Sequence, residues 1–143
     1  MHTLDTEPTR AAVLAWVADL YAGAVDHKDA AGFAAAFTED AWMRFGNAAP
    51  VIGRDAIEAA IAQFFSAIAA LQHETVGAWY DDGALIVEAN VTYTRHDGGI
   101  VTVPAVTIFR LTDAAGPPFL AHRCQMYVDL APLFAPGPGG AAV

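Results

Sequence analysis

The sequence is short of basic residues: it contains one lysine, Lys28, and six arginines against 16 acidic residues, which gives a formal net charge of −9. Proteins that bind nucleic acids present clusters of Lys and Arg to the phosphate backbone, so we expect no nucleic-acid partner. Cysteine is equally scarce. The single Cys124 excludes an internal disulfide and favours a reducing, cytoplasmic environment.

Signals for export, membrane insertion and cofactor binding are also lacking. The first residues do not show the basic-then-apolar pattern of a signal peptide, and the longest weakly polar stretch, residues 56–71, is too short to span a bilayer. No glycine-rich phosphate loop follows a strand, and the five histidines show no metal-binding spacing such as His-x-His. We therefore expect a cytoplasmic protein with no membrane contact, no bound metal and no cofactor.

Apolar residues, by contrast, are in excess. Of the 143 residues, 55% are hydrophobic and 16% are charged. This length suits one domain, which we place at residues 8–134, between a flexible N-terminus of residues 1–7 and a disordered, Pro- and Gly-rich tail of residues 135–143. The apolar surplus exceeds what the core of one small domain needs, and so predicts an internal pocket, an interface, or both.

Helical periodicity marks the first half of the chain. Apolar residues at spacings of three and four predict a helix over residues 8–25 and a third helix from about residue 53 to residue 71. Between them, Phe33 and Phe37 lie four residues apart, which predicts a brief second helix that ends near residue 40.

Strand periodicity dominates the second half. A short strand is expected at residues 41–45, and alternation predicts four more near residues 73–81, 84–94, 100–111 and 120–130. Asp82-Gly83 and Asp97-Gly98-Gly99 are hairpin turns between them. The resulting order, α-α-β-β-α-β-β-β-β, indicates an α+β fold in which one face of the sheet covers the helices.

The turn at Asp97-Gly98 decides which residues of two strands share a face. If these two residues form its centre, one face carries Glu88, Asn90, Thr92, Val103, Ala105, Thr107 and Phe109. The other face then carries Val87, Ala89, Val91, Tyr93, Thr102, Pro104, Val106, Ile108 and Arg110. An odd-numbered loop or a bulge would break this grouping. Pattern alone favours the second face as the core, which would leave Glu88 in solvent.

Short motifs recur in a fixed order between residues 8 and 134. They are DAAGF at 29–33, FTEDA at 37–41, GRDAI at 53–57, VTYTRHDG at 91–98, IFRL at 108–111 and YVDL at 127–130. In this order they resemble the SnoaL-like branch of the nuclear-transport-factor-2-like superfamily. The resemblance implies a cone-shaped, cystatin-like fold, in which three helices from the N-terminal half pack on a curved, mostly antiparallel sheet around an internal pocket. Such folds host isomerases, cyclases, epoxide hydrolases and proteins without activity, so the fold does not fix the function.

Two enzyme families of this superfamily offer catalytic patterns for comparison. In the ketosteroid isomerase pattern, Tyr21 matches the helix tyrosine, whereas Phe45 replaces the general base and Thr107 replaces the second acid. In the limonene epoxide hydrolase pattern, the arginine and the two aspartates fall on Glu88, Asn90 and Met126. Phenylalanine cannot accept a proton, and neither catalytic set is retained. We therefore expect neither standard reaction.

Both patterns imply that the face with Glu88, Asn90 and Thr107 is turned toward the pocket, and on this basis we assign Glu88 to the cavity. A carboxyl group among apolar side chains suits proton transfer. The resulting catalytic candidates are Glu88, Tyr21 and Asn90. The ligand-binding candidates are Phe45, Thr107, Met126 and His122.

The sequence thus predicts a cofactor-free protein with an apolar pocket for a small, hydrophobic, oxygen-bearing molecule, and acid–base groups suited to isomerase, cyclase or hydrolase chemistry. The alternative is a non-catalytic ligand-binding or dimerisation module, or an accessory subunit. The convex face, which would carry Val87, Ala89, Val91 and Tyr93, is the expected contact of a homodimer.

Overall fold

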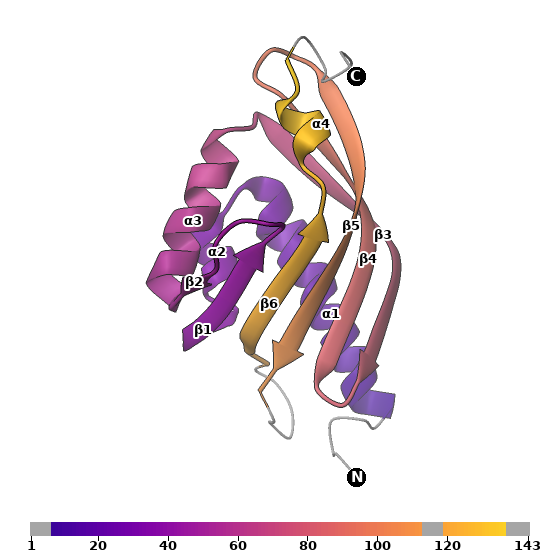
Figure 1. Ribbon diagram of the computed structural model, residues 1–143. Helices are drawn as coiled ribbons and strands as arrows, with labels where there is room; N and C mark the ends of the chain where they lie inside the picture. Colours follow the sequence, from indigo (N-terminus) through magenta and orange to yellow (C-terminus); the bar gives the residue numbers. More distant parts are fainter. Residues whose placement is uncertain (1–6, 113–118, 137–143) are drawn as a thin grey trace.

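The computed structural model describes residues 7–112 and 119–136 of the chain (Figure 1). Apart from Glu7, Ala135 and Pro136, the N-terminal and C-terminal segments expected to be flexible lie outside these residues. Within the described ranges the helical segments are α1 (Glu7–Gly23), the 3-10 helix η2 (Val25–His27), α2 (Ala30–Ala34), α3 (Arg54–Ser66) and α4 (Ala131–Phe134).

The strands form one mixed sheet. They are β1 (Phe37–Phe45), β2 (Val51–Ile52), β3 (Ala70–Asp81), β4 (Ala84–Thr94), β5 (Ile100–Leu111) and β6 (Ala121–Val128). Their order in the sheet is β2-β1-β6-β5-β4-β3, and all neighbours pair antiparallel except β1 with β6. The predicted α+β class and element order are confirmed, with η2 and α4 added.

The second helix is shorter than its sequence pattern predicts. Asp29 caps α2 by accepting a hydrogen bond from the Gly32 backbone N–H, and the helix ends at Ala34. The carbonyl of Phe37 accepts hydrogen bonds from Nε and Nη2 of Arg54, at 2.9 and 2.7 Å. These bonds tie the start of β1 to the first turn of α3. The prediction that residues 37–40 end a helix is therefore wrong, because this segment forms the beginning of β1.

The two hairpin turns differ from each other. Asp82 and Gly83 both have positive φ, 50° and 78°, in a two-residue turn between paired Asp81 and Ala84, as predicted. Between β4 and β5, Thr94 pairs with Ile100, so the loop contains the five residues 95–99. This odd number shifts β4 by one position relative to β5, so that Glu88 faces Val106 instead of Thr107.

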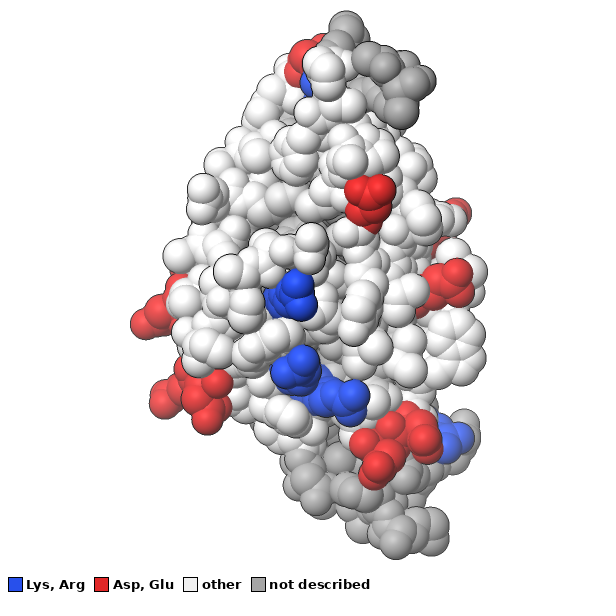
Figure 2. Space-filling view, in the orientation of Figure 1, with Lys and Arg blue, Asp and Glu red and all other residues white. Residues whose placement is uncertain are grey.

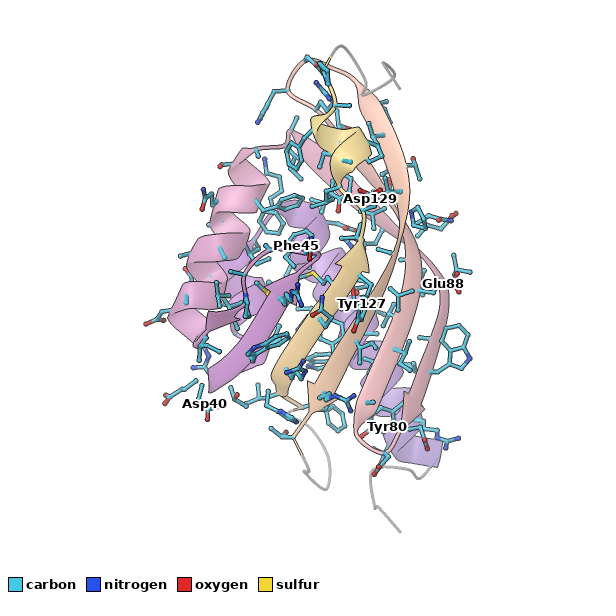
Figure 3. The ribbon with its side chains drawn as sticks, viewed as in Figure 1. Asp40, Phe45, Tyr80, Glu88, Tyr127 and Asp129 are labelled. Carbon is cyan, nitrogen blue, oxygen red and sulfur yellow. The ribbon has the colours of Figure 1, made fainter. Side chains whose placement is uncertain are left out.

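The shifted register reverses the face that we predicted for β4. Val87, Ala89, Val91 and Tyr93 are buried on the concave face, and Glu88 is exposed on the convex one. The predicted faces of β5 are right: Val103, Thr107 and Phe109 point inward. In Figure 3, Glu88 projects from the strands on the side away from α3, whereas Phe45 lies between α3 and the sheet.

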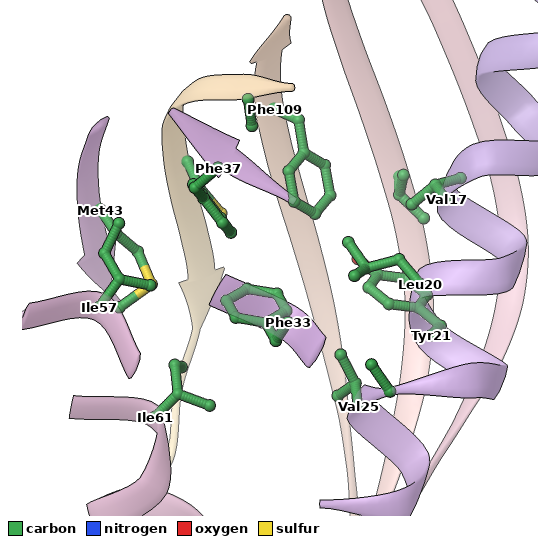
Figure 4. Packing of buried hydrophobic residues seen from close by; sticks show 14 of the residues in the cluster. Val17, Leu20, Tyr21, Val25, Phe33, Phe37, Met43, Ile57, Ile61 and Phe109 are labelled. Carbon is green, nitrogen blue, oxygen red and sulfur yellow. The ribbon is translucent and has the colours of Figure 1, made fainter. Parts of the chain in front are cut away.

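The core lies between the helices and the concave face of the sheet. In Figure 1, α1 passes behind the strands and α3 lies beside β1. Figure 4 shows Val17, Leu20 and Tyr21 of α1 directed toward the side of the core that holds Phe33 and Phe109, while Ile57 lies beside Met43. Large apolar side chains that are fully buried, such as Phe37, Phe109, Met43 and Ile57, hold these layers together by removing apolar area from water.

The convex face of the sheet remains uncovered and carries few charges (Figure 2). Trp79 is 55% exposed and Tyr127 is 58% exposed. The Arg123 guanidinium stacks over the Trp42 ring at 3.7 Å, which is a cation–π contact. Because β4 is shifted, the apolar residues predicted for this face from β4 are in the core instead.

Candidate functional site

A small apolar cavity of about 50 Å³ lies between the helices and the concave face of the sheet. It is lined by Tyr21, Val25, Phe33, Phe45, Ile61, Phe64, Phe65, Leu71, His73, Val91, Tyr93, Ala105, Thr107, Phe109, Met126 and Val128. A space of this size holds a few water molecules, whereas pockets for drug-sized ligands measure about 300–1,000 Å³. A ligand must therefore displace side chains of the wall to enter.

The polar centre of this wall is a histidine paired with a carboxylate. Nδ1 of His73 lies 2.7 Å from Oδ1 of Asp26, and the backbone N–H of His73 donates to Oδ2 at 3.2 Å. The side chains are only 13% and 19% exposed. Because a carboxylate accepts but does not donate, Nδ1 carries a proton in this contact, and the imidazole tautomer that fits it has its lone pair on Nε2. Among residues 7–112 and 119–136, no hydrogen-bond partner occupies Nε2.

The turn after α1 places Asp26 beside β3. Asp26 lies in η2, and Lys28, two residues later, adopts a left-handed backbone with φ of 58°. The Lys28 ammonium donates to the carbonyls of Ile68 and Ala69, at 2.8 and 3.4 Å, where the chain leaves α3 and enters β3. This lysine therefore anchors the turn that carries Asp26 to the segment that carries His73.

Tyr21 completes the polar group. Its ring stacks on the His73 imidazole with centroids 4.4 Å apart. Burial raises the pKa of the Tyr21 phenol, and a side-chain hydrogen bond with Thr107 opposes this rise only in part. Burial also raises the pKa of Tyr93 to about 12. Both phenols are thus protonated near neutral pH and able to donate a hydrogen bond to an oxygen in the cavity.

Comparison with known proteins identifies the fold family. A family described as SnoaL-like domain matches residues 17–115. The chain belongs to this SnoaL-like family. Comparison with functionally curated proteins gave no match.

Solved structures resemble this SnoaL-like domain over most of its length. A candidate SnoaL-like polyketide cyclase from Jannaschia sp. CCS1 has 20% identity and a TM-score of 0.73, with 97% of this chain and 99% of that one covered. A protein of ketosteroid isomerase-like fold from Catenulispora acidiphila DSM 44928, in complex with trimethylamine, has 19% identity and a TM-score of 0.65, with 83% and 85% covered.

A third similar structure is TerC co-crystallised with polyporic acid. It has 15% identity and a TM-score of 0.69, and the match covers 84% of this SnoaL-like domain and 92% of that chain. At these identities the comparisons establish a shared α+β fold. The sequence-based resemblance to the SnoaL-like branch is confirmed.

Four of the seven site residues predicted from the sequence of this SnoaL-like domain line the cavity: Tyr21, Phe45, Thr107 and Met126. The other three do not. Glu88 and Asn90 lie on the convex face because of the odd loop between β4 and β5. His122 is exposed because Arg110 pairs with Arg123 and Leu111 pairs with Ala121, which leaves His122 as the extra residue of a β-bulge.

Asp26 and His73 are the site residues that the sequence argument missed. They are 47 positions apart, and each stands in an ordinary context, a polar turn and the start of a strand. The available signal was the inward alternation of Leu71 and His73, which pair with the buried residues Tyr93 and Val91.

In the described part of this SnoaL-like domain, no three His, Cys, Asp or Glu side chains gather as candidate metal ligands. Within the same residues, none of the helices is long and apolar enough to cross a membrane.

Proposed function

We propose that this SnoaL-like domain binds a small, apolar, oxygen-bearing molecule and moves a proton on it without a cofactor, with His73 as the base. The observation that carries the proposal is the 2.7 Å contact between Asp26 and Nδ1 of His73, in the wall of an apolar cavity. Asp26 fixes the tautomer that leaves Nε2 able to accept a proton. This is the acid–base chemistry used by isomerases and cyclases.

The hydroxyl groups of the cavity supply the second requirement of such a reaction. Removing a proton next to a carbonyl puts negative charge on the carbonyl oxygen, and a hydrogen-bond donor lowers the barrier by stabilising that charge. Tyr21 and Thr107 line the same cavity as His73, and Tyr21 contacts the imidazole directly. We assign proton transfer to His73 and stabilisation of the substrate oxygen to Tyr21.

The test uses a model ketone, 2-tetralone, which is apolar and carries one oxygen. In deuterated water, transfer of an α-proton of 2-tetralone to Nε2 of His73 and return of a deuteron labels the ketone, which NMR follows. We expect the wild-type chain to accelerate labelling and His73→Gln to lose about 100-fold of that acceleration. His27→Gln is the matched control, since His27 is exposed in η2. Equal labelling by wild type and His73→Gln would contradict the proposal.

A second candidate is binding without turnover. The small cavity favours it, since about 50 Å³ leaves no room for a substrate unless the wall opens. Binding of 2-tetralone with no acceleration of labelling, in the wild-type chain, would select this alternative. The similar proteins that hold trimethylamine and polyporic acid support binding of a small molecule, which both candidates share.

We further propose that the convex face forms a homodimer contact. Trp79, Ile86 and Tyr127 are exposed on this sheet, which also carries the stacked pair of Arg123 and Trp42, and exposed aromatic and Arg side chains are typical of interfaces. Light scattering at micromolar concentration is expected to give twice the chain mass, and Tyr127→Glu to give a monomer. A monomeric wild-type chain would contradict this, and would favour an accessory subunit that binds a different chain.

A further inference from the structure

A second apolar hollow adjoins the cavity at His73. This groove has a volume of about 320 Å³ and lies among α3, the β1–β2 segment and α4. Its wall includes Met43, Val51, Ala60, Leu130 and Phe134. Among the described residues that line it, Gln63 is the one polar side chain. The groove therefore suits an uncharged, apolar group.

Two side chains line both the cavity and the groove: Phe45, at the end of β1, and Phe64, on α3. Their rings are 4.7 Å apart and tilted by 58°, so the pair forms a wall between the two hollows. Phe64 also meets Tyr93 edge-on at 5.8 Å. Each phenylalanine is half-buried, and only ring and van der Waals contacts hold it in place.

The size of the cavity makes this wall important. At about 50 Å³ it cannot hold a ring of benzene size, which fills about 150 Å³ in an apolar protein cavity. The groove beyond the two rings supplies the missing volume, and rotation of a phenyl ring breaks no hydrogen bond. The hollows can thus merge through a change in two side chains.

We propose that Phe45 and Phe64 are a gate between the groove and His73, and that the ligand occupies both hollows. Its oxygen-bearing end lies beside His73 and Tyr21, and its apolar remainder lies in the groove against α3 and α4. The inference rests on the proposed binding function and specifies the ligand class: an elongated, flat, uncharged molecule with its reactive oxygen at one end.

The test is the binding of Prodan, a neutral naphthalene ketone whose fluorescence shifts in an apolar site. Phe64→Ala removes half of the gate and is expected to raise the association rate about tenfold. Phe64→Leu, which keeps most of the apolar volume, serves if the alanine variant fails to fold. Ala60 lines the groove and not the cavity, so Ala60→Trp reduces the groove volume and is expected to weaken binding about tenfold.

Two controls separate this inference from the proposed reaction. The first is the readout itself: Prodan binding is followed by fluorescence and requires no proton transfer, so a wild-type chain that fails to label 2-tetralone leaves the gate testable. Ala62→Trp, on the exposed side of α3, is the matched control for Ala60→Trp. Unchanged affinity in Ala60→Trp, an unchanged association rate in Phe64→Ala or Phe64→Leu, or no Prodan binding by the wild-type chain would each overturn the proposal.

Discussion

Asp26 and His73 form a close hydrogen-bonded contact, 2.7 Å between Oδ1 and Nδ1, that joins the turn after α1 to the first residues of β3. The same carboxylate accepts the backbone N–H of His73. Both side chains are mostly buried and His73 lines the apolar cavity, so the pair affects both the stability of the fold and the chemistry of the cavity.

The structural consequence is a loss of stability in Asp26→Ala. This change leaves two donors of His73, the ring Nδ1–H and the backbone N–H, without their partner in a largely buried place. We expect the free energy of unfolding, measured by urea denaturation, to fall by about 1–3 kcal/mol. Asp19→Ala, at an exposed position of α1, is the control and should change little. If Asp26→Ala and Asp19→Ala lowered the free energy of unfolding equally, the contact between Asp26 and His73 would not stabilise the fold.

Lys28→Met tests the anchor of this turn. The variant loses the ammonium that donates to Ile68 and Ala69, near the end of α3, and we expect a loss of about 1 kcal/mol in the free energy of unfolding. Because Asp26 is two residues away, the labelling rate of 2-tetralone should fall as well. Lys28→Arg, which keeps a cation, should retain more of both. An undiminished labelling rate in Lys28→Met would show that the anchor does not position Asp26.

Asp97 provides a pH-dependent prediction. Hydrogen bonds from the Arg95 guanidinium, and then from the Gly99 backbone N–H, hold the pKa of the Asp97 carboxyl below its ordinary value of 3.8. A lowered pKa in the folded state stabilises the chain above the unfolded-state pKa, and this contribution disappears as the pH falls through the lower value. The stability difference between wild type and Asp97→Asn should thus be present at neutral pH and vanish in acid. A difference that grows on acidification would contradict it.

The buried phenol of Tyr93 changes stability with pH in the opposite direction to Asp97. Burial raises the pKa of Tyr93 to about 12, so the folded chain favours the protonated phenol. This contribution to stability is fully present below the ordinary pKa of 10.0 and is lost as the pH rises through the higher value. Tyr93→Phe cannot ionise there, and its stability, followed by circular dichroism, should decline less in alkali than that of the wild-type chain. An identical alkaline decline in both would contradict the assignment.

The sequence predicts the element order well because helix and strand periodicities are strong local signals, as in the apolar stripe of α3 with Ile57, Ile61 and Phe65. Local periodicity gives the wrong prediction for residues 37–40, which form the start of β1 and not the end of a helix. There the pairing of Phe37 with Ala121 and its bonds to Arg54 override a helical pattern. These partners are distant in the chain, so no local pattern contains them.

The site is less predictable than the fold because it depends on the registers in which β4, β5 and β6 pair. One additional residue in the loop 95–99 moves Glu88 from the cavity to the convex face, and one bulge does the same to His122. The apolar alternation of Val87 and Val91 did indicate the correct face, and the comparison with related catalytic patterns misplaced it. Tyr21, Phe45 and Thr107 were assigned to the cavity correctly, and they come from α1, the end of β1 and β5.

The central claim, that His73 and not the convex-face carboxylate acts as the base, is tested most directly by comparing 2-tetralone labelling in His73→Gln and Glu88→Gln under identical conditions. The structure predicts that Glu88→Gln labels the ketone as fast as the wild-type chain, while His73→Gln loses about 100-fold of the acceleration. Loss of labelling in Glu88→Gln, together with an unchanged rate in His73→Gln, would contradict the account.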